Sequence, residues 1–204
     1  MRQDAEAAAA LLFDGLKVDG CGPSQNISAW TAELNRTGRP ILLEDCLTKR
    51  YTRQGKVPPI PLAEIFEECP GNFFRLGSDI APQFYSTMYN LIYTYSIMAR
   101  YNSPGHPASR PGCWTYSDML EVGNGMSATE SRTHFAAFAI TSSPLVLGFD
   151  LANHSLYNQL YPIVANRRVI AINQQWAGSA GVLAANSSNY FEARDPNSNP
   201  NPNP

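Results

Sequence analysis

This chain alternates short apolar, strand-like segments with helix-like segments, and the alternation constrains its fold more than any other feature. The unit recurs at intervals of roughly 30–40 residues, which is typical of an α/β protein with a parallel sheet or barrel. The candidate strands cover 16–19, 41–43, 72–79, 119–122 and 144–149. Acidic residues close these segments, as at the active-site rim of a (β/α)8 barrel. They are Asp19, Glu44, Asp45, Asp79, Asp118 and Asp150.

The candidate strands are too few for a closed barrel. A complete (β/α)8 barrel has eight strands and typically about 250 residues. We therefore expect residues 1–175 to form about the second half of a barrel whose upstream part is missing. Further on, 180–184 and 190–193 resemble two short strands of a separate all-β unit within 176–194. The Asn/Pro-rich tail, 195–204, cannot bury a core, and we expect it to be disordered.

Helix signals fill the intervals between the candidate strands. The clearest helix covers 83–100, where apolar side chains from Phe84 to Met98 recur on one face, as core packing requires. Ser127 and Glu130 form a capping-box pattern that opens another helix, which extends to about Ser142. Further helices are expected at 3–13, 28–35, 62–69 and 156–160, and loops at 47–61 and 101–113.

Charge and composition argue against several classes of partner. The net charge is −2 and no basic stripe appears, so we expect no nucleic-acid partner. No apolar run is long enough to predict a membrane span. The three histidines do not cluster and none of the four cysteines forms a CxxC pair, so we expect no metal site and no cofactor.

The cysteines and four Asn-x-Ser/Thr sequons favour a secretory compartment, in which disulfides persist. Residues 1–20 lack the pattern of a signal peptide, so we expect either that Met1 is not the natural start or that the N-terminal part is missing. The expected location is secreted or lysosomal/vacuolar. The sequons lie at Asn26, Asn35, Asn153 and Asn186.

Lys17 and Asp19 are two residues apart on a candidate strand, so their side chains share one face. A lysine cation keeps a neighbouring carboxylate ionised, and an ionised carboxylate is what a glycosidase nucleophile must be. A surface ion pair on an edge strand is the alternative interpretation.

Arg75 and Asp79 are four residues apart, with Gly77 between them. On a regular strand both side chains face one side, and the glycine leaves room for a ligand. Asp79 alternatively caps a helix that has Ala81 and Pro82 in its first turn, and the local sequence favours the cap.

Trp114 lies close in sequence to Asp118. An aromatic ring near a carboxylate suits sugar binding, because sugars offer apolar C–H faces and hydroxyl rims. A tryptophan that only caps a core is an equal alternative. Two carboxylates at the ends of successive barrel strands can flank one glycosidic bond, and a retaining glycosidase needs them roughly 5–5.5 Å apart.

Taken in order, these residues resemble the melibiase-type family of α-galactosidases and α-N-acetylgalactosaminidases, which is glycoside hydrolase family 27. The similarity runs from about residue 3 to residue 193. The matching segments are Gly15–Cys21, Leu34–Arg39, Arg75-x-x-x-Asp79, Gly112–Trp114, Asp118–Leu120, Thr133–Phe135, Pro144–Leu151 and Val169–Gln174.

The resemblance implies a (β/α)8 TIM barrel followed by an antiparallel β-sandwich, and retaining hydrolysis of α-galactoside oligosaccharides or glycoconjugates. It makes Asp19 the nucleophile and Asp79 the general acid/base. It makes Lys17 and Arg75 ligands of the sugar and places Asp118 in the pocket.

The resemblance also implies a disulfide between Cys46 and Cys69, with Cys21 paired to an upstream cysteine. The family's Cys-Glu at the fifth strand is replaced here by Glu44-Asp45-Cys46, so either carboxylate is a candidate for that glutamate's role. The family's Trp-Asn-Asp-Pro-Asp-Met-Leu appears as Trp114-Thr-Tyr-Ser-Asp118-Met-Leu, without one acid and the asparagine.

Three functions stay open at this point. The first is an α-galactosidase, with α-N-acetylgalactosaminidase and β-L-arabinopyranosidase as close variants. The second is a non-catalytic, sugar-binding or interaction relative, and the third is a fragment without independent function. A half barrel leaves two open sheet edges, so we expect this chain to be soluble with its missing half or as a homodimer.

Overall fold

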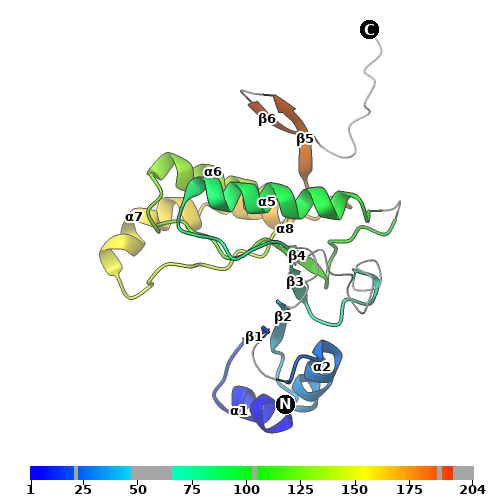
Figure 1. Ribbon diagram of the computed structural model, residues 1–204. Helices are drawn as coiled ribbons and strands as arrows, with labels where there is room; N and C mark the ends of the chain where they lie inside the picture. The colour runs from blue at the N-terminus through cyan, green and yellow to red at the C-terminus, as the bar shows by residue number, and fades with distance from the viewer. Residues whose placement is uncertain (21–22, 47–65, 103–104, 188–189, 195–204) are drawn as a thin grey trace.

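The computed structural model describes residues 1–20, 23–46, 66–102, 105–187 and 190–194 (Figure 1). At its centre is a parallel four-stranded sheet in the order β1-β2-β3-β4, so each strand pairs with the next along the chain. The α-helices α2 (Ile27–Arg36) and α5 (Phe84–Ala99) lie in two of the crossovers. This βαβ arrangement confirms the predicted partial barrel. The strands are β1 (Gly15–Val18), β2 (Leu42–Asp45), β3 (Phe73–Arg75) and β4 (Trp114–Tyr116).

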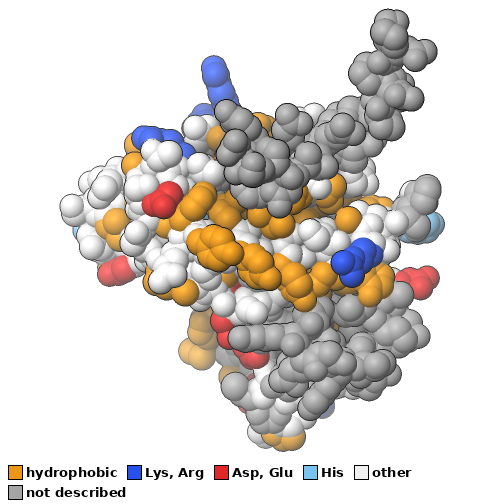
Figure 2. Space-filling view, turned by 45° about the horizontal axis from the view of Figure 1, so that its top comes forward, with side chains coloured by type: hydrophobic (Ala, Val, Ile, Leu, Met, Phe, Trp, Pro, Cys, Tyr) orange, Lys and Arg blue, Asp and Glu red, His pale blue; other side chains and the backbone are white. Residues whose placement is uncertain are grey.

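Helices cover the sheet in two groups (Figure 1). The first group is α1 (Arg2–Ala10) and α2, whose apolar side chains pack with Val18 and Leu43 of β1 and β2. The second group lies beside β3 and β4, and its larger core contains Phe74 and Leu76. This group comprises α5, α6 (Ala128–Ile140), α7 (His154–Val164) and α8 (Arg167–Gln174). Hydrophobic side chains also remain on the surface in a band where α5 runs (Figure 2).

The strand register decides which side chains can meet at the site. Alternate residues of a strand face opposite sides of the sheet. Val18, which packs against helices, is aligned with Asp45, so Asp45 lies on the helix-facing side. Lys17 is aligned with Glu44, and both occupy the other side. The sheet therefore separates the two adjacent acids Glu44 and Asp45.

Most predicted helices are confirmed, with shifts at their ends. The strongest prediction, 83–100, is observed as α5, and the predicted capping box opens α6 with reciprocal bonds between Ser127 and Glu130. Helix α1 ends at Ala10 rather than at residue 13, because Leu12 adopts a left-handed backbone with φ 63°. Of the helix predicted at 62–69, the structure describes only its last turn, at 66–68.

Two predicted strands, 119–122 and 144–149, are wrong. Within the described residues the two segments meet only at a single parallel bridge between Leu120 and Leu147. Two left-handed residues, Asp118 with φ 97° and Gly123 with φ 91°, flank the first segment and limit its extended stretch to the four residues between them. The fourth strand is instead Trp114–Tyr116, which is too short for an alternating pattern to reveal.

The C-terminal part forms an antiparallel hairpin of β5 (Val182–Ser187) and β6 (Tyr190–Arg194), close to the predicted strands. The β-sandwich and the domain boundary near residue 175 stay predictions. The predicted loop at 47–61, Cys21 and the tail at 195–204 lie outside the described residues. Across the part of the chain that is described, no helix has the length and apolar character needed to cross a membrane.

Candidate active site

Polar side chains from all four parallel strands gather at the carboxyl end of the sheet. Lys17 lies on β1, and Asp19 is the first residue after this strand. Glu44 lies near the end of β2. Arg75 closes β3, and Asp118 follows β4 by two residues. Because parallel strands end at the same edge, residues far apart in the sequence meet there.

Lys17 connects the first two strands. Its Nζ lies 3.8 Å from Asp19 Oδ2 and 4.0 Å from Glu44 Oε1. The shared face of Lys17 and Asp19 is therefore confirmed. The side chains of Lys17 and Asp19 are 39% and 36% exposed, whereas that of Glu44 is only 11% exposed. This contact with a buried acid on the neighbouring strand distinguishes the pair from an isolated surface ion pair.

Glu44 is a buried acid at the centre of the cluster. Burial raises the pKa of its carboxyl group above the usual glutamate value, and the cations of Lys17 and Arg75 only partly oppose this effect. Its Oε1 is buried and accepts no hydrogen bond from the described residues. A buried polar atom normally has a hydrogen-bond partner, so Oε1 is suited to a ligand hydroxyl.

Arg75 is fixed between two carboxylates. It is 1% exposed, its Nη1 lies 3.2 Å from Asp118 Oδ2, and its Nη2 hydrogen-bonds to Asp79 Oδ1. Burial lowers the pKa of Arg75, but Asp118, Asp79 and Cys46 together outweigh burial and the net pKa is raised. The N-cap of α5 is Gln83, so the helix-cap interpretation of Asp79 is wrong. The 67% exposed side chain of Asp79 is held instead by Arg75.

Asp118 acts as a fixed acceptor beneath the site. Its Oδ2 also accepts a hydrogen bond from the backbone N–H of Ile80, at 3.2 Å, and its Oδ1 accepts one from Met119 N–H, at 2.9 Å. Asp118 is 5% exposed. It therefore positions both Arg75 and the loop that carries Asp79.

Asn90 ties the same loop to α5, and the sequence analysis missed it. Its Oδ1 accepts a hydrogen bond from Ser78 N–H, and its Nδ2 donates to Ser78 O, each at 3.0 Å. Nδ2 also donates to Ser117 O. Gly77 makes room for this contact, because its φ is 86° and a Cβ there would overlap the Asn90 side chain. A polar residue within the buried stripe of 83–100 is the signal that could have identified Asn90.

Tyr116 is a second missed residue. It closes β4, is aligned with Arg75 and is only 2% exposed. Burial raises the pKa of its hydroxyl, and the negative charges of Glu44 and Asp118 act in the same direction. Tyr116 therefore stays a neutral hydrogen-bonding group beside the acids. Its position two residues before Asp118, in the segment that departs from the family pattern, is the available signal.

Trp114 lies away from these acids. It begins β4, its ring packs edge-on against Trp176 with centroids 5.2 Å apart, and it lines a cavity of about 410 Å³ with Leu42 and Phe73. Leu42 and Phe73 begin β2 and β3, so this cavity lies at the amino ends of the strands. The structure does not bring Trp114 or Asp45 together with the acidic cluster.

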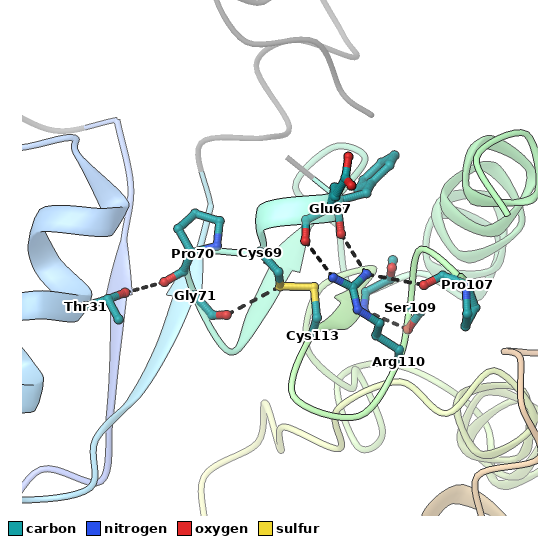
Figure 3. The surroundings of a disulfide bond; sticks show 11 residues. Thr31, Glu67, Cys69, Pro70, Gly71, Pro107, Ser109, Arg110 and Cys113 are labelled. Carbon is teal, nitrogen blue, oxygen red and sulfur yellow. Dashed lines mark hydrogen bonds between the residues drawn. A yellow bond between two sulfur atoms is a disulfide. The ribbon is translucent and has the colours of Figure 1, made fainter. Parts of the chain in front are cut away.

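The predicted Cys46–Cys69 disulfide is wrong, because Cys69 is bonded to Cys113 with Cα atoms 5.9 Å apart (Figure 3). Cys46 follows β2 at its carboxyl end, whereas Cys69 precedes β3 at its amino end. Because β2 and β3 are parallel, these two residues lie at opposite ends of the sheet. The observed bond instead joins the segments that lead into β3 and β4.

Arg110 reinforces this disulfide. Its guanidinium donates to the backbone carbonyls of Phe66, at 2.7 Å, and Glu67, at 2.9 Å. Figure 3 shows Arg110 next to Cys113 and reaching toward Glu67. Together these contacts fix the amino ends of β3 and β4, whose other ends carry Arg75 and Tyr116.

The arrangement offers carboxylates, one lysine and one arginine as its chemical groups. Among the described residues, no group of three or more His, Cys, Asp or Glu side chains is placed to hold a metal ion. A cluster of this kind can hold sugar hydroxyls with Lys17 and Glu44, and can use Asp19 and Asp79 for nucleophilic and proton-transfer chemistry.

Curated relatives are similar over most of this chain. The chain is 33% identical over 196 residues to mouse α-N-acetylgalactosaminidase, covering 93% of this chain and 45% of that protein. It is 31% identical over 185 residues to α-galactosidase 2 of Arabidopsis thaliana, covering 88% of this chain and 42% of that protein. The chain therefore spans less than half the length of these relatives.

Solved structures show the same fold. The crystal structure of α-galactosidase I from Mortierella vinacea superposes with a TM-score of 0.70 at 25% identity, covering 94% of this chain and 51% of that one. The α-galactosidase of Saccharomyces cerevisiae superposes with a TM-score of 0.66 at 24% identity, covering 89% of this chain and 43% of that one. The model of the melibiase family described as alpha galactosidase A matches residues 1–175. This chain belongs to that melibiase family.

Proposed function

We propose that the protein to which this chain belongs is a retaining glycoside hydrolase that removes terminal α-linked galactose. The observation that carries the proposal is the placement of Asp19 beside Lys17 and of Asp79 on Arg75, at the carboxyl end of one parallel sheet. The similarity to α-galactosidases and α-N-acetylgalactosaminidases supports the same reaction.

In the first step Asp79 donates a proton to the leaving oxygen while Asp19 attacks the anomeric carbon. The glycosidic bond breaks, the leaving group departs as an alcohol, and the sugar is bound covalently to Asp19. In the second step Asp79, now a base, removes a proton from water, and the water oxygen displaces Asp19. Two inversions at the anomeric carbon retain its configuration.

The surrounding residues have defined parts in this proposal. Lys17 lies beside Asp19 as a counter-cation and donates to sugar hydroxyls, which the 3.8 Å separation and its partial exposure support. Glu44 offers its Oε1, which accepts no hydrogen bond from the described residues, to a sugar hydroxyl. Arg75 and Asp118 hold Asp79 and its loop in place.

The upstream half of the barrel completes the pocket in this proposal. The described sheet contains four parallel strands, and the relatives are about twice as long as this chain. We therefore expect slow turnover, or none, from these 204 residues alone. A secreted or lysosomal/vacuolar location is supported by the Cys69–Cys113 disulfide, because disulfides persist in oxidising compartments.

The test is hydrolysis of an aryl α-galactoside by the full-length parent protein, alongside Asp19→Ala and Asp79→Ala variants. We expect the parent to turn over at a rate normal for an enzyme, about 1–10³ s⁻¹, and each variant to lose most of that rate. Asp14→Asn is a matched control, because Asp14 lies just before β1 at the opposite end of the sheet and is 90% exposed.

Full activity in the Asp19→Ala variant would show that Asp19 is not the nucleophile. A silent parent would favour the non-catalytic alternative, in which the cluster only binds sugar. A preference for aryl α-N-acetylgalactosaminide over the galactoside would assign the second candidate activity, which the similarity to the mouse enzyme supports.

A further inference from the structure

Three tyrosines form a ladder on the outer side of α5. Tyr85, Tyr89 and Tyr93 are spaced four residues apart, so their rings follow one another along one face of the helix. Neighbouring ring centroids lie 6.1 and 6.4 Å apart, and the ring planes differ by only 23° and 13°. Tyr85 is 78% exposed and Tyr89 is 59% exposed. The rings of Tyr85 and Tyr89 are thus largely presented to solvent, and the partly buried Tyr93 continues the row.

The ladder shares a cavity with the proposed proton donor. A cavity of about 410 Å³ is lined by all three tyrosines and by Gly77, Ser78 and Asp79, together with Ser86 and Asn90 of α5. Asn90 fixes the loop of Ser78 to the helix, so the distance between ladder and loop is set by hydrogen bonds. A molecule that contacts Asp79 from this side therefore also contacts the tyrosine rings.

The ladder lies on the side of α5 that faces away from the core of the described residues. Helix α5 connects β3 and β4, which are neighbours within the sheet. The inner side of α5 is already packed through residues such as Leu91, Tyr95 and Met98, and the ladder occupies the other side. Figure 2 shows a band of hydrophobic side chains across this face of the molecule.

We propose that the tyrosine ladder, Tyr85, Tyr89 and Tyr93, binds the leaving-group part of a saccharide substrate. The inference rests on the proposed function, because Asp79 as proton donor must lie next to the leaving oxygen. Whatever extends from that oxygen into this cavity belongs to the leaving group. Tyrosine suits a pyranose ring, since its ring face packs on apolar C–H groups while its hydroxyl reaches sugar hydroxyls.

The ladder then selects a class of substrate. A small aglycone reaches only the loop of Asp79, whereas successive sugar rings meet successive tyrosines. The protein would favour galactose carried on an oligosaccharide over galactose carried on a short alkyl group. Binding energy from the leaving-group sugars also orients the scissile bond, as remote contacts do in other enzymes.

The test uses the full-length parent protein carrying Asp19→Ala, which prevents turnover. Isothermal titration calorimetry compares its affinity for raffinose with its affinity for methyl α-galactoside. Raffinose carries two further sugar rings on its galactose, and the methyl glycoside carries none. We expect raffinose to bind about tenfold more tightly. The Tyr85→Ala/Tyr89→Ala variant should reduce this ratio to near one, and Tyr85→Phe/Tyr89→Phe should retain most of it because the rings remain.

Tyr161→Ala is the matched control. Tyr161 is 52% exposed and contacts Tyr157 at i−4 on α7, with ring centroids 5.6 Å apart, but it does not line this cavity. The raffinose advantage should survive in this control variant.

Two results would overturn the ladder proposal: no raffinose advantage in the full-length protein with all three tyrosines present, or an unchanged ratio in the Tyr85→Ala/Tyr89→Ala variant. Self-association measured by sedimentation and abolished by the same variant would assign the face to a second copy instead. A raffinose advantage lost in the variant, in a parent protein that hydrolyses nothing, would keep the ladder and reject the proposed catalysis. Hydrolysis by the parent protein, together with an unchanged affinity ratio in the Tyr85→Ala/Tyr89→Ala variant, would keep the proposed catalysis and reject the ladder.

Discussion

The buried guanidinium of Arg75 forms an ion pair with the buried carboxylate of Asp118, with 3.2 Å between Nη1 and Oδ2. Their side chains are 2% and 7% exposed, so neither charge is solvated by bulk water. Removing one partner of such a pair leaves the other charge uncompensated, which is far more costly than removing both.

Arg75→Met should therefore lower the free energy of unfolding by about 3–5 kcal/mol. Urea denaturation measures the change. The double variant Arg75→Met/Asp118→Asn should recover a large part of the loss, because it no longer buries an unpaired charge, and asparagine tolerates the φ of 97° and keeps an acceptor oxygen for the backbone N–H groups. A loss in Arg75→Met of no more than about 0.5 kcal/mol, the usual range for surface substitutions, would contradict the buried pair.

Glu44 should make the protein less stable as the pH rises. Burial raises the pKa of its carboxyl group in the folded state above the unfolded value of 4.5. The folded protein therefore holds this proton more tightly, and its contribution to stability is present below pH 4.5 and lost as the pH rises through the folded-state pKa. Glu44→Gln removes the titration. The difference in unfolding free energy between the parent and this variant should fall from about pH 4.5 upward; a difference that grows with pH would show that the pKa is lowered.

The Cys69–Cys113 disulfide should be present in the oxidised protein and should stabilise it. The two cysteines are 44 residues apart, and the chain-entropy model assigns about 4 kcal/mol to closing a loop of that length. Cys69→Ser/Cys113→Ser should lose roughly that amount in the absence of reductant. Peptide mapping under non-reducing conditions should recover Cys69 linked to Cys113; recovery of Cys69 linked to Cys46 would restore the pairing that the resemblance implied.

Gly77→Ala should disturb the loop that carries Asp79. The new Cβ would combine strain at φ 86° with overlap against Asn90, and backbone strain of this kind costs about 1–3 kcal/mol. Gly112→Ala is a matched control, because Gly112 has φ 83° but nothing lies within 4 Å of its added Cβ. Thermal denaturation should show a larger loss for Gly77→Ala. Equal losses would mean that the contact between Gly77 and Asn90 contributes nothing.

Local patterns predicted the elements that carry strong, repeated signals. Helix α5 has a long apolar stripe, and the Ser127–Glu130 capping box specifies its own hydrogen bonds, so both were predictable. The shared face of Lys17 and Asp19 follows from strand periodicity alone, provided that the strand is identified correctly.

Contacts between distant segments were not predictable in the same way. The pairing of Cys69 with Cys113 depends on which ends of two strands are adjacent, and no local pattern encodes that. Strand β4 is three residues long, so Tyr116 gave no alternation to detect. In the sequence, Asn90 only interrupts an apolar stripe. Its role depends on hydrogen bonds to Ser78 and Ser117, which lie on loops distant in sequence.

The most direct test of the account concerns the separate roles of Asp19 and Asp79. With an aryl α-galactoside and added azide, the full-length Asp19→Gly variant should form the β-galactosyl azide, because azide replaces the missing nucleophile and inverts the anomeric carbon once. The Asp79→Ala variant should form the α-galactosyl azide, because azide attacks the intermediate on Asp19 and completes a second inversion. The opposite pair of anomers, or an Asp19→Gly variant that hydrolyses substrate at the parent's rate, would contradict the assignment.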